Sequence, residues 1–266
     1  MIVLRRFVRD RRRSLAWWAA GMVALVAMTV AFYPSVRGEE SFEELMRDLP
    51  AAVRALVGAQ QGVPFTSPPG YLHSRMFTVI VPVVLLVFGI GLGARVVGGP
   101  EDEGTLEPVL ANPVSRRRLL LERALAVVVL VLGLTAVGVL ALVGLGPPTG
   151  ALDGISWSHV LQAWAAALCL TLLHAGVALA VGAAWGRRAP ALGVAAAMAV
   201  GGYLLEGLMS ASDRTSSLLR ASPWHWYLDR NALVDGTTIE ATVVPLAIAG
   251  VAVALGAWRF ERRDLR

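Results

Sequence analysis

Residues 99–118 form a charged, turn-rich segment between two long apolar stretches. Four carboxylates lie in its first half and three arginines in its second half: Glu101, Asp102, Glu103, Glu107, Arg116, Arg117 and Arg118. Such groups can form ion pairs with a complementary surface, which set the register and specificity of a contact more than its affinity. A segment that only joined two helices could be shorter and less charged, so we expect this one to contact a partner. For Arg117 and Arg118 a second interpretation stays open, a solvated pair that only orients the chain in a membrane.

Catalysis by this chain is not expected, because the residue types that it needs are absent or badly spaced. The sequence contains no lysine, which excludes the Gly-Lys-Ser/Thr loop that binds nucleotide phosphates and also a Schiff-base nucleophile. The four histidines never form a close metal-binding pair: His73, His159, His174 and His225. Cys169 is the single cysteine, so one chain can form neither a disulfide nor a thiolate cluster. We predict no catalytic residues, no bound metal and no cofactor in this chain.

The elements on either side of the charged segment are predicted to be membrane helices. Apolar residues make up 56% of the chain and charged residues only 16%, which is unusual for a soluble domain. A helix needs roughly 20 apolar residues to cross the hydrocarbon core, and six continuous runs are long enough or nearly so. These runs are residues 14–33, 71–97, 119–145, 158–185, 191–209 and 241–258. Their continuity argues against alternating strands, so we predict an all-α polytopic membrane protein with six transmembrane helices.

The distribution of arginine predicts the orientation of these helices. By count along the sequence, 17 of the 24 arginines fall on the side that contains both termini and residues 99–118, and seven fall on the other side. The richer side is expected to be cytoplasmic, in a multi-pass protein of the cell membrane. Residues 1–13 mix apolar side chains with arginines and are expected to lie along the inner membrane surface as an interfacial helix, or else to form a disordered basic leader. The first run is too long to be a cleaved signal peptide.

Two outer loops are expected, at residues 34–70 and 210–240. In the first, Ser41 and Glu44 match a capping box at the start of a helix, Pro50 predicts the start of a second helix, and Gly58 predicts its end. The second loop contains the aromatic run Ser222-Pro-Trp-His-Trp-Tyr227. Trp and Tyr favour the membrane interface, so anchoring and a role in a gate or substrate contact both stay open.

The charged segment also carries residues that would shape it into a lever. Gly104 and Pro108 permit a sharp bend, Pro113 disfavours helix at Asn112, and Ser115 is placed to cap the following helix. The run Glu103-Gly-Thr-Leu-Glu107, followed by Pro113-Val-Ser-Arg116, resembles the cytoplasmic coupling segment of type-2 ABC exporter permeases. The resemblance continues in Tyr33-Pro34, in residues 49–58 and 67–71, in Ser222-Pro223 and in residues 258–265.

This resemblance implies a six-span half-transporter that pairs with a second permease chain, either identical or a paralogue. It also implies two copies of a separate ATP-binding subunit, which would bind ATP and Mg²⁺, and export of a drug, an antibiotic or a lipid-like molecule. We expect the chain to lie in the lipid bilayer and to bind no nucleic acid. The residues assigned to ATPase coupling are Glu101, Asp102, Glu103, Gly104, Thr105, Leu106, Glu107, Pro113, Val114, Ser115 and Arg116.

Glu206 is the residue most suggestive of a substrate path, because an ionisable group in a span is costly and favours a functional role. We assign Met198, Tyr203 and Glu206 to such a path, with Glu206 contacting a cationic substrate. The alternatives are that Glu206 reaches water at the membrane boundary and that Met198 and Tyr203 only pack. His174, inside the fourth span, fits an interhelical hydrogen bond or a proton path.

Three classes of function therefore stay open. The first is the permease subunit of an ATP-driven exporter, and the second is an assembly or signalling partner of an ABC ATPase. The third is a secondary transporter or a polytopic enzyme. Spans two to five contain few charged groups for ion coupling and no paired catalytic set, which argues against the third class.

Overall fold

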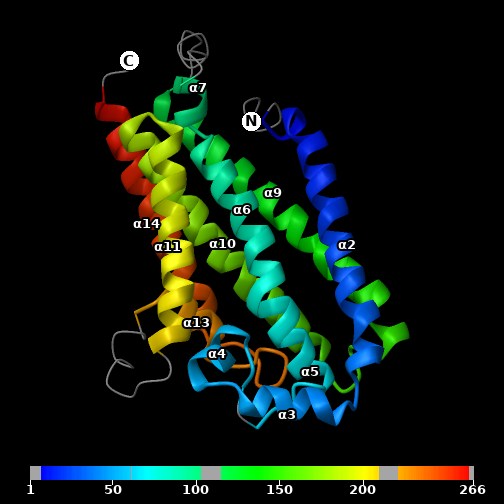
Figure 1. Cartoon of the computed structure of the whole chain (residues 1–266). Helices are drawn as coiled ribbons and strands as arrows, with labels where there is room; N and C mark the ends of the chain where they lie inside the picture. Colours follow the sequence, from blue (N-terminus) through cyan, green and yellow to red (C-terminus); the bar gives the residue numbers. More distant parts are fainter. Residues whose placement is uncertain (1–6, 61, 103–114, 210–220, 264–266) are drawn as a thin grey trace.

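Six long helices form the body of the molecule (Figure 1). The computed structural model describes residues 7–60, 62–102, 115–209 and 221–263, and within these ranges the regular structure is entirely helical. The spanning helices are α2 (Arg12–Val36), the continuous stretch Pro68–Ala94, α9 (Arg116–Leu145), α10 (Trp157–Trp185), α11 (Arg188–Met209) and α14 (Glu240–Arg262). Each is long and apolar enough to cross a bilayer. The predicted all-α, six-span fold is confirmed.

The second span consists of three consecutive helical segments. It begins with α5 (Pro68–Tyr71), continues as the π-helix η1 (Leu72–Ile80) and ends as α6 (Val81–Ala94). The span therefore starts three residues before the predicted boundary. Ser67 explains the early start, because its hydroxyl accepts a hydrogen bond from Gly70 N at 3.3 Å and Pro68 follows as the first helical residue.

Short helices cover the end of the bundle that lies far from α7 (Gly98–Asp102), as Figure 1 shows. They are α3 (Glu40–Asp48), α4 (Ala51–Leu56) and α13 (Pro223–Leu228). The capping box predicted at Ser41 is wrong, since Glu39 is the N-cap of α3 and Ser41 Oγ instead lies 3.3 Å from Glu39 Oε2. Pro50 does precede α4, and Gly58 follows it with a φ of 70°, as predicted.

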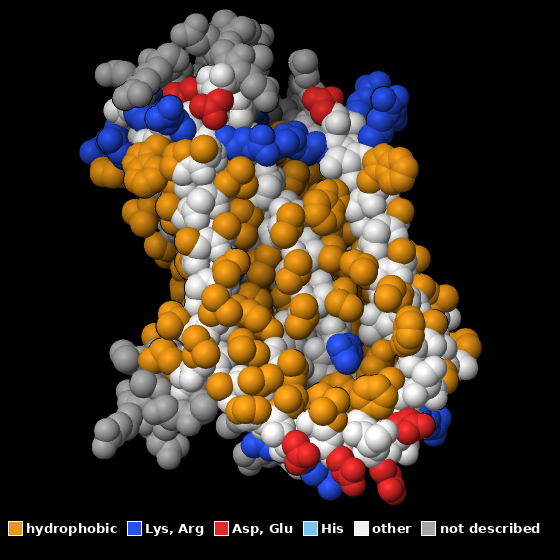
Figure 2. Space-filling model, viewed as in Figure 1, with side chains coloured by type: hydrophobic (Ala, Val, Ile, Leu, Met, Phe, Trp, Pro, Cys, Tyr) orange, Lys and Arg blue, Asp and Glu red, His pale blue; other side chains and the backbone are white. Residues whose placement is uncertain are grey.

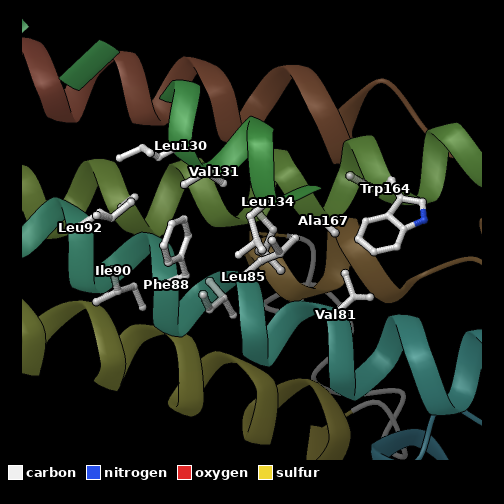
Figure 3. Close-up of a cluster of buried hydrophobic side chains, with 14 of the residues drawn as sticks. Val81, Leu85, Phe88, Ile90, Leu92, Leu130, Val131, Leu134, Trp164 and Ala167 are labelled. Carbon is white, nitrogen blue, oxygen red and sulfur yellow. The ribbon is translucent and has the colours of Figure 1, made fainter. Parts of the chain in front are cut away.

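The helix α10 lies at the centre and packs against α6, α9, α11 and α14. Small residues allow this close approach: a β-carbon on Gly93 of α6 would collide with the Ala175 carbonyl of α10, and one on Gly256 of α14 would collide with Ala180. In a bilayer such close packing replaces the hydrophobic effect as the force between helices. Figure 3 shows the layer of hydrophobic side chains that fills the space between α6, α9 and α10. Its labelled side chains are Val81, Leu85, Phe88, Ile90, Leu92, Leu130, Val131, Leu134, Trp164 and Ala167.

Two buried polar side chains in the spans bond to the preceding turn of their own helix. Thr135 Oγ1 donates to the Val131 carbonyl at 2.9 Å, and His174 Nδ1 lies 2.8 Å from the Leu170 carbonyl. These bonds reduce the cost of placing a polar group in hydrocarbon, and His174 Nε2 is buried without a hydrogen-bond partner among the described residues. For His174 the geometry favours a structural role within α10.

The outer surface is divided into an apolar zone and two charged ends, as Figure 2 shows on one face. The first residues of α2 and the last residues of α14 lie at the same end of the bundle as α7 (Figure 1). Residues 7–10 are helical and precede α2, and the Arg11 guanidinium carbon lies 3.7 Å from the centre of the Phe7 ring. The remainder of the predicted interfacial helix, residues 1–6, lies outside the described residues.

Candidate functional site

The first candidate site is the short helix α7, which begins the predicted coupling segment. Glu101 forms an ion pair with Arg263 just past the end of α14, and the two side chains are only 7% and 12% exposed. Asp102 Oδ2 accepts a hydrogen bond from the backbone N of Arg188 at 2.9 Å. Both carboxylates therefore bind within the chain and fix α7 to the ends of α14 and α11.

The start of α9 is fixed to the same place. Ser115 caps α9 as predicted, accepting a hydrogen bond from Arg118 N at 3.3 Å. The Arg116 guanidinium donates to the Arg263 carbonyl at 2.6 Å and lies over the ring of Phe260 at 5.9 Å. The described residues on either side of positions 103–114 are thus both bound to the end of α14. We call α7, the first residues of α9 and the residues of α14 and the α10–α11 turn that hold them the base.

The turn between α10 and α11 completes this base. Gly186 ends α10 with a φ of 69°, and a β-carbon on Gly186 would collide with Glu101 and Arg263. A β-carbon on Gly98 would lie 2.8 Å from the Arg187 carbonyl carbon. Glycine suits the two positions for different reasons: Gly186 has a positive φ, and at Gly98 the backbone lies directly against the backbone of the turn.

Arg123 is a further residue of this end of the molecule. Its side chain is buried in α9, and its Nη1 donates to the carbonyl of Val96 at 2.5 Å, just past the end of α6. The sequence signalled Arg123 and Arg263 only as basic residues near a predicted boundary. Nothing in the sequence pointed to the carbonyl or carboxylate that each one contacts.

Several of the residues predicted to couple to an ATPase lie outside the described residues: Glu103, Gly104, Thr105, Leu106, Glu107, Pro113 and Val114. The structure brings together the four that it does describe, which are Glu101, Asp102, Ser115 and Arg116. All four lie around the residues where α14 ends or α11 begins.

The second candidate site lies at the opposite end, where α11 meets α4 and α13. Glu206 is buried, and its Oε1 lies 2.9 Å from His225 Nδ1, so the carboxylate accepts a hydrogen bond from the ring. The Tyr203 hydroxyl donates to the Leu56 carbonyl, and its ring lies 4.9 Å from that of Trp224. Met198 lies further into α11 and is half-buried. These contacts hold the end of α11 against α4 and α13.

The aromatic run is held by buried contacts and borders a cavity. The Tyr227 hydroxyl donates to the Phe77 carbonyl of η1 at 2.6 Å, and burial raises its pKa, so it remains a donor. Beside it lies a cavity of about 670 Å³, lined in part by His225, Asp229 and Glu240. His225, which contacts Glu206, lines this cavity, and Arg230 lies among the lining residues together with the two carboxylates. Among the described residues, no group of three or more His, Cys, Asp or Glu side chains could hold a metal ion.

Comparison with known proteins identifies the family. The family model described as "ABC-2 family transporter protein" matches residues 1–265. A search of curated proteins gives no match to this chain. The family is one of membrane permease subunits, in which a separate subunit carries the ATPase activity. With a match that covers nearly the whole length and six apolar helices in the fold, this chain belongs to the ABC-2 family of transporter proteins, as a multi-pass membrane permease subunit.

Proposed function

We propose that this chain is the permease half of an ATP-driven exporter in the cell membrane, with both termini in the cytoplasm. It moves an amphiphilic small molecule, of drug, antibiotic or lipid-like character, out of the cytoplasm. Its partners are two copies of an ATP-binding subunit, which bind ATP and Mg²⁺, and a second permease chain that is identical or a paralogue. The arginine-rich end that contains α7 supports this orientation.

The observation that carries the proposal is the base on which residues 103–114 stand. Glu101 and Arg116 both bind at Arg263, and Asp102 binds at Arg188. A force applied to the segment by an ATPase would therefore reach α14 and the α10–α11 turn together.

The substrate path is proposed to follow α11 through Met198, Tyr203 and Glu206. At the far end of α11, the contacts of Tyr203 with Leu56 and of Glu206 with His225 close the path. Release of the substrate would require these contacts to open towards the cavity lined by Asp229 and Glu240. Three carboxylates along this route, Glu206, Asp229 and Glu240, against one arginine, Arg230, suit a cationic amphiphile.

The experiment that tests the proposal is transport by the reconstituted complex. The chain would be purified with its ATP-binding subunit and placed in vesicles with the ATPase facing outward. Uptake of a fluorescent cationic amphiphile should then require ATP and Mg²⁺. A complex that hydrolyses ATP but moves no amphiphile in either direction would contradict the proposal and favour an assembly or signalling role.

A further inference from the structure

The second span carries an exposed arginine within the apolar part of the molecule. Arg75 lies seven residues after Pro68, the first residue of that span, which is about 10 Å along a helix axis. Its side chain is exposed, whereas Arg123 in the third span is buried and bonded to a backbone carbonyl. An exposed guanidinium at this depth faces lipid tails or headgroups, where an unpaired charge is costly.

Among the described residues, Arg75 interacts with two aromatic neighbours, Phe65 and Tyr71. The guanidinium carbon lies 5.7 Å from the centre of the Phe65 ring, and no described residue forms a hydrogen bond or an ion pair with it. A ring at this distance attracts the cation but accepts none of its five N–H donors. The side chain therefore reaches towards the end of the span with its hydrogen-bonding capacity unused by the described residues.

The π-helix aligns Arg75 with an apolar strip. Arg75 lies in η1, whose geometry includes the bond from Thr78 Oγ1 to the His73 carbonyl, five residues back, at 2.9 Å. A π turn contains about one residue more than an α turn and so shifts the faces of a helix. The exposed residues of this span then follow at intervals of four, and Val79, Val83 and Val87 are 41%, 52% and 56% exposed. The strip leads from the cation towards the middle of the membrane.

We propose that Arg75 binds the phosphate of a phospholipid in the leaflet opposite α7, with an acyl chain lying along Val79, Val83 and Val87. The planar guanidinium presents paired donors that match two phosphate oxygens. Next to the strip, Val84 lines an apolar groove of about 200 Å³ together with residues of α2, which extends the surface available to the chain. This inference rests on the membrane location of the fold and not on the direction or substrate of transport.

Native mass spectrometry of the purified protein tests the proposal. The protein would be mixed with equal amounts of phosphatidylglycerol and phosphatidylcholine, of which only the first leaves its phosphate without a cationic neighbour in the same headgroup. Wild type should retain phosphatidylglycerol, and Arg75→Gln should retain about tenfold less, the change expected for loss of one charge-assisted contact. Arg75→Lys should retain an intermediate amount of lipid, because lysine keeps the positive charge but lacks the paired N–H donors of the planar guanidinium. Arg47→Gln, which removes an exposed arginine of α3 outside the spans, should match wild type.

Three results would overturn the proposal. Equal lipid retention by wild type and Arg75→Gln would show that Arg75 does not bind lipid. Displacement of the lipid by inorganic phosphate would indicate a site for soluble anions. A loss of dimer mass in Arg75→Gln with unchanged lipid would assign the cation to an acidic residue of a second chain. None of these readings depends on transport, so failure here is distinguishable from failure of the exporter proposal.

Discussion

Glu101 and Arg263 lie 162 positions apart in the sequence and form an ion pair that joins the end of α7 to the end of α14. Both side chains are largely buried, and the Arg263 carbonyl also accepts a hydrogen bond from Arg116 at 2.6 Å. One residue thus binds the chain before and after the segment 103–114. Both flanks of that segment are therefore attached to the end of α14.

We predict that Glu101→Gln destabilises this end of the bundle, because Arg263 is left buried without its counter-charge. The expected cost is about 3 kcal/mol, at the lower end of the range for a broken buried ion pair. It would be measured as a lower midpoint of thermal unfolding in detergent. Arg262→Gln is the matched control, since Arg262 is the exposed neighbour that lies over Trp258. The double variant Glu101→Arg with Arg263→Glu restores an opposite-charge pair and should be more stable than Glu101→Gln. If the double variant is no more stable than Glu101→Gln, packing and not charge dominates the contact.

A second prediction concerns the close approach of α6 and α10. Gly93→Ala should destabilise the protein by about 1–3 kcal/mol, because the new methyl group collides with the Ala175 carbonyl and forces the helices apart. Gly91→Ala is the control in the same helix, since nothing lies within 4 Å of its β-carbon position. That change should be neutral or slightly stabilising, because alanine favours a helix. Equal losses for the two variants in thermal unfolding would contradict the packing argument.

The six spans could be predicted because long apolar runs report directly on helices in a bilayer. The cap at Ser115 was also predictable, since the signal is local: a serine two residues after a proline and directly before a helix-forming run. The pair of Glu101 with Arg263 was not, because a single sequence does not show which distant arginine a carboxylate meets. The π-helix was equally hidden, since its residues differ little from those of an ordinary α-helix and only the hydrogen-bond pattern distinguishes the two.

The Glu206 contact leads to a third prediction. Glu206→Gln keeps the size of the side chain and its ability to hydrogen-bond His225, but removes the negative charge. Export of a cationic amphiphile should fall about tenfold, which corresponds to loss of about 1.4 kcal/mol of attraction, while a neutral amphiphile of similar size is exported normally. ATP hydrolysis without substrate should not change. Glu44→Gln removes an exposed carboxylate of α3, at the same end of the bundle but outside the cavity lining, and is the control. An equal decline for both substrates would assign Glu206 to the boundary and not to the path.

The last prediction tests the segment that lies between Glu101 and Arg116. If Glu103 and Glu107 pair with basic residues of the ATP-binding subunit, reversing both charges should weaken its binding. Two charge pairs at a partly exposed interface contribute on the order of 1–3 kcal/mol, so the affinity in a pull-down should fall roughly ten- to hundredfold. The difference from wild type should shrink as salt is raised, because screening already weakens the native attraction. The matched control reverses Glu40 and Glu44 of α3, at the opposite end of the bundle, and should leave ATPase binding unchanged. If both double variants bind the ATPase and transport like wild type, the coupling role of the segment is wrong, whereas a loss confined to the first would show that these two carboxylates contact the ATPase.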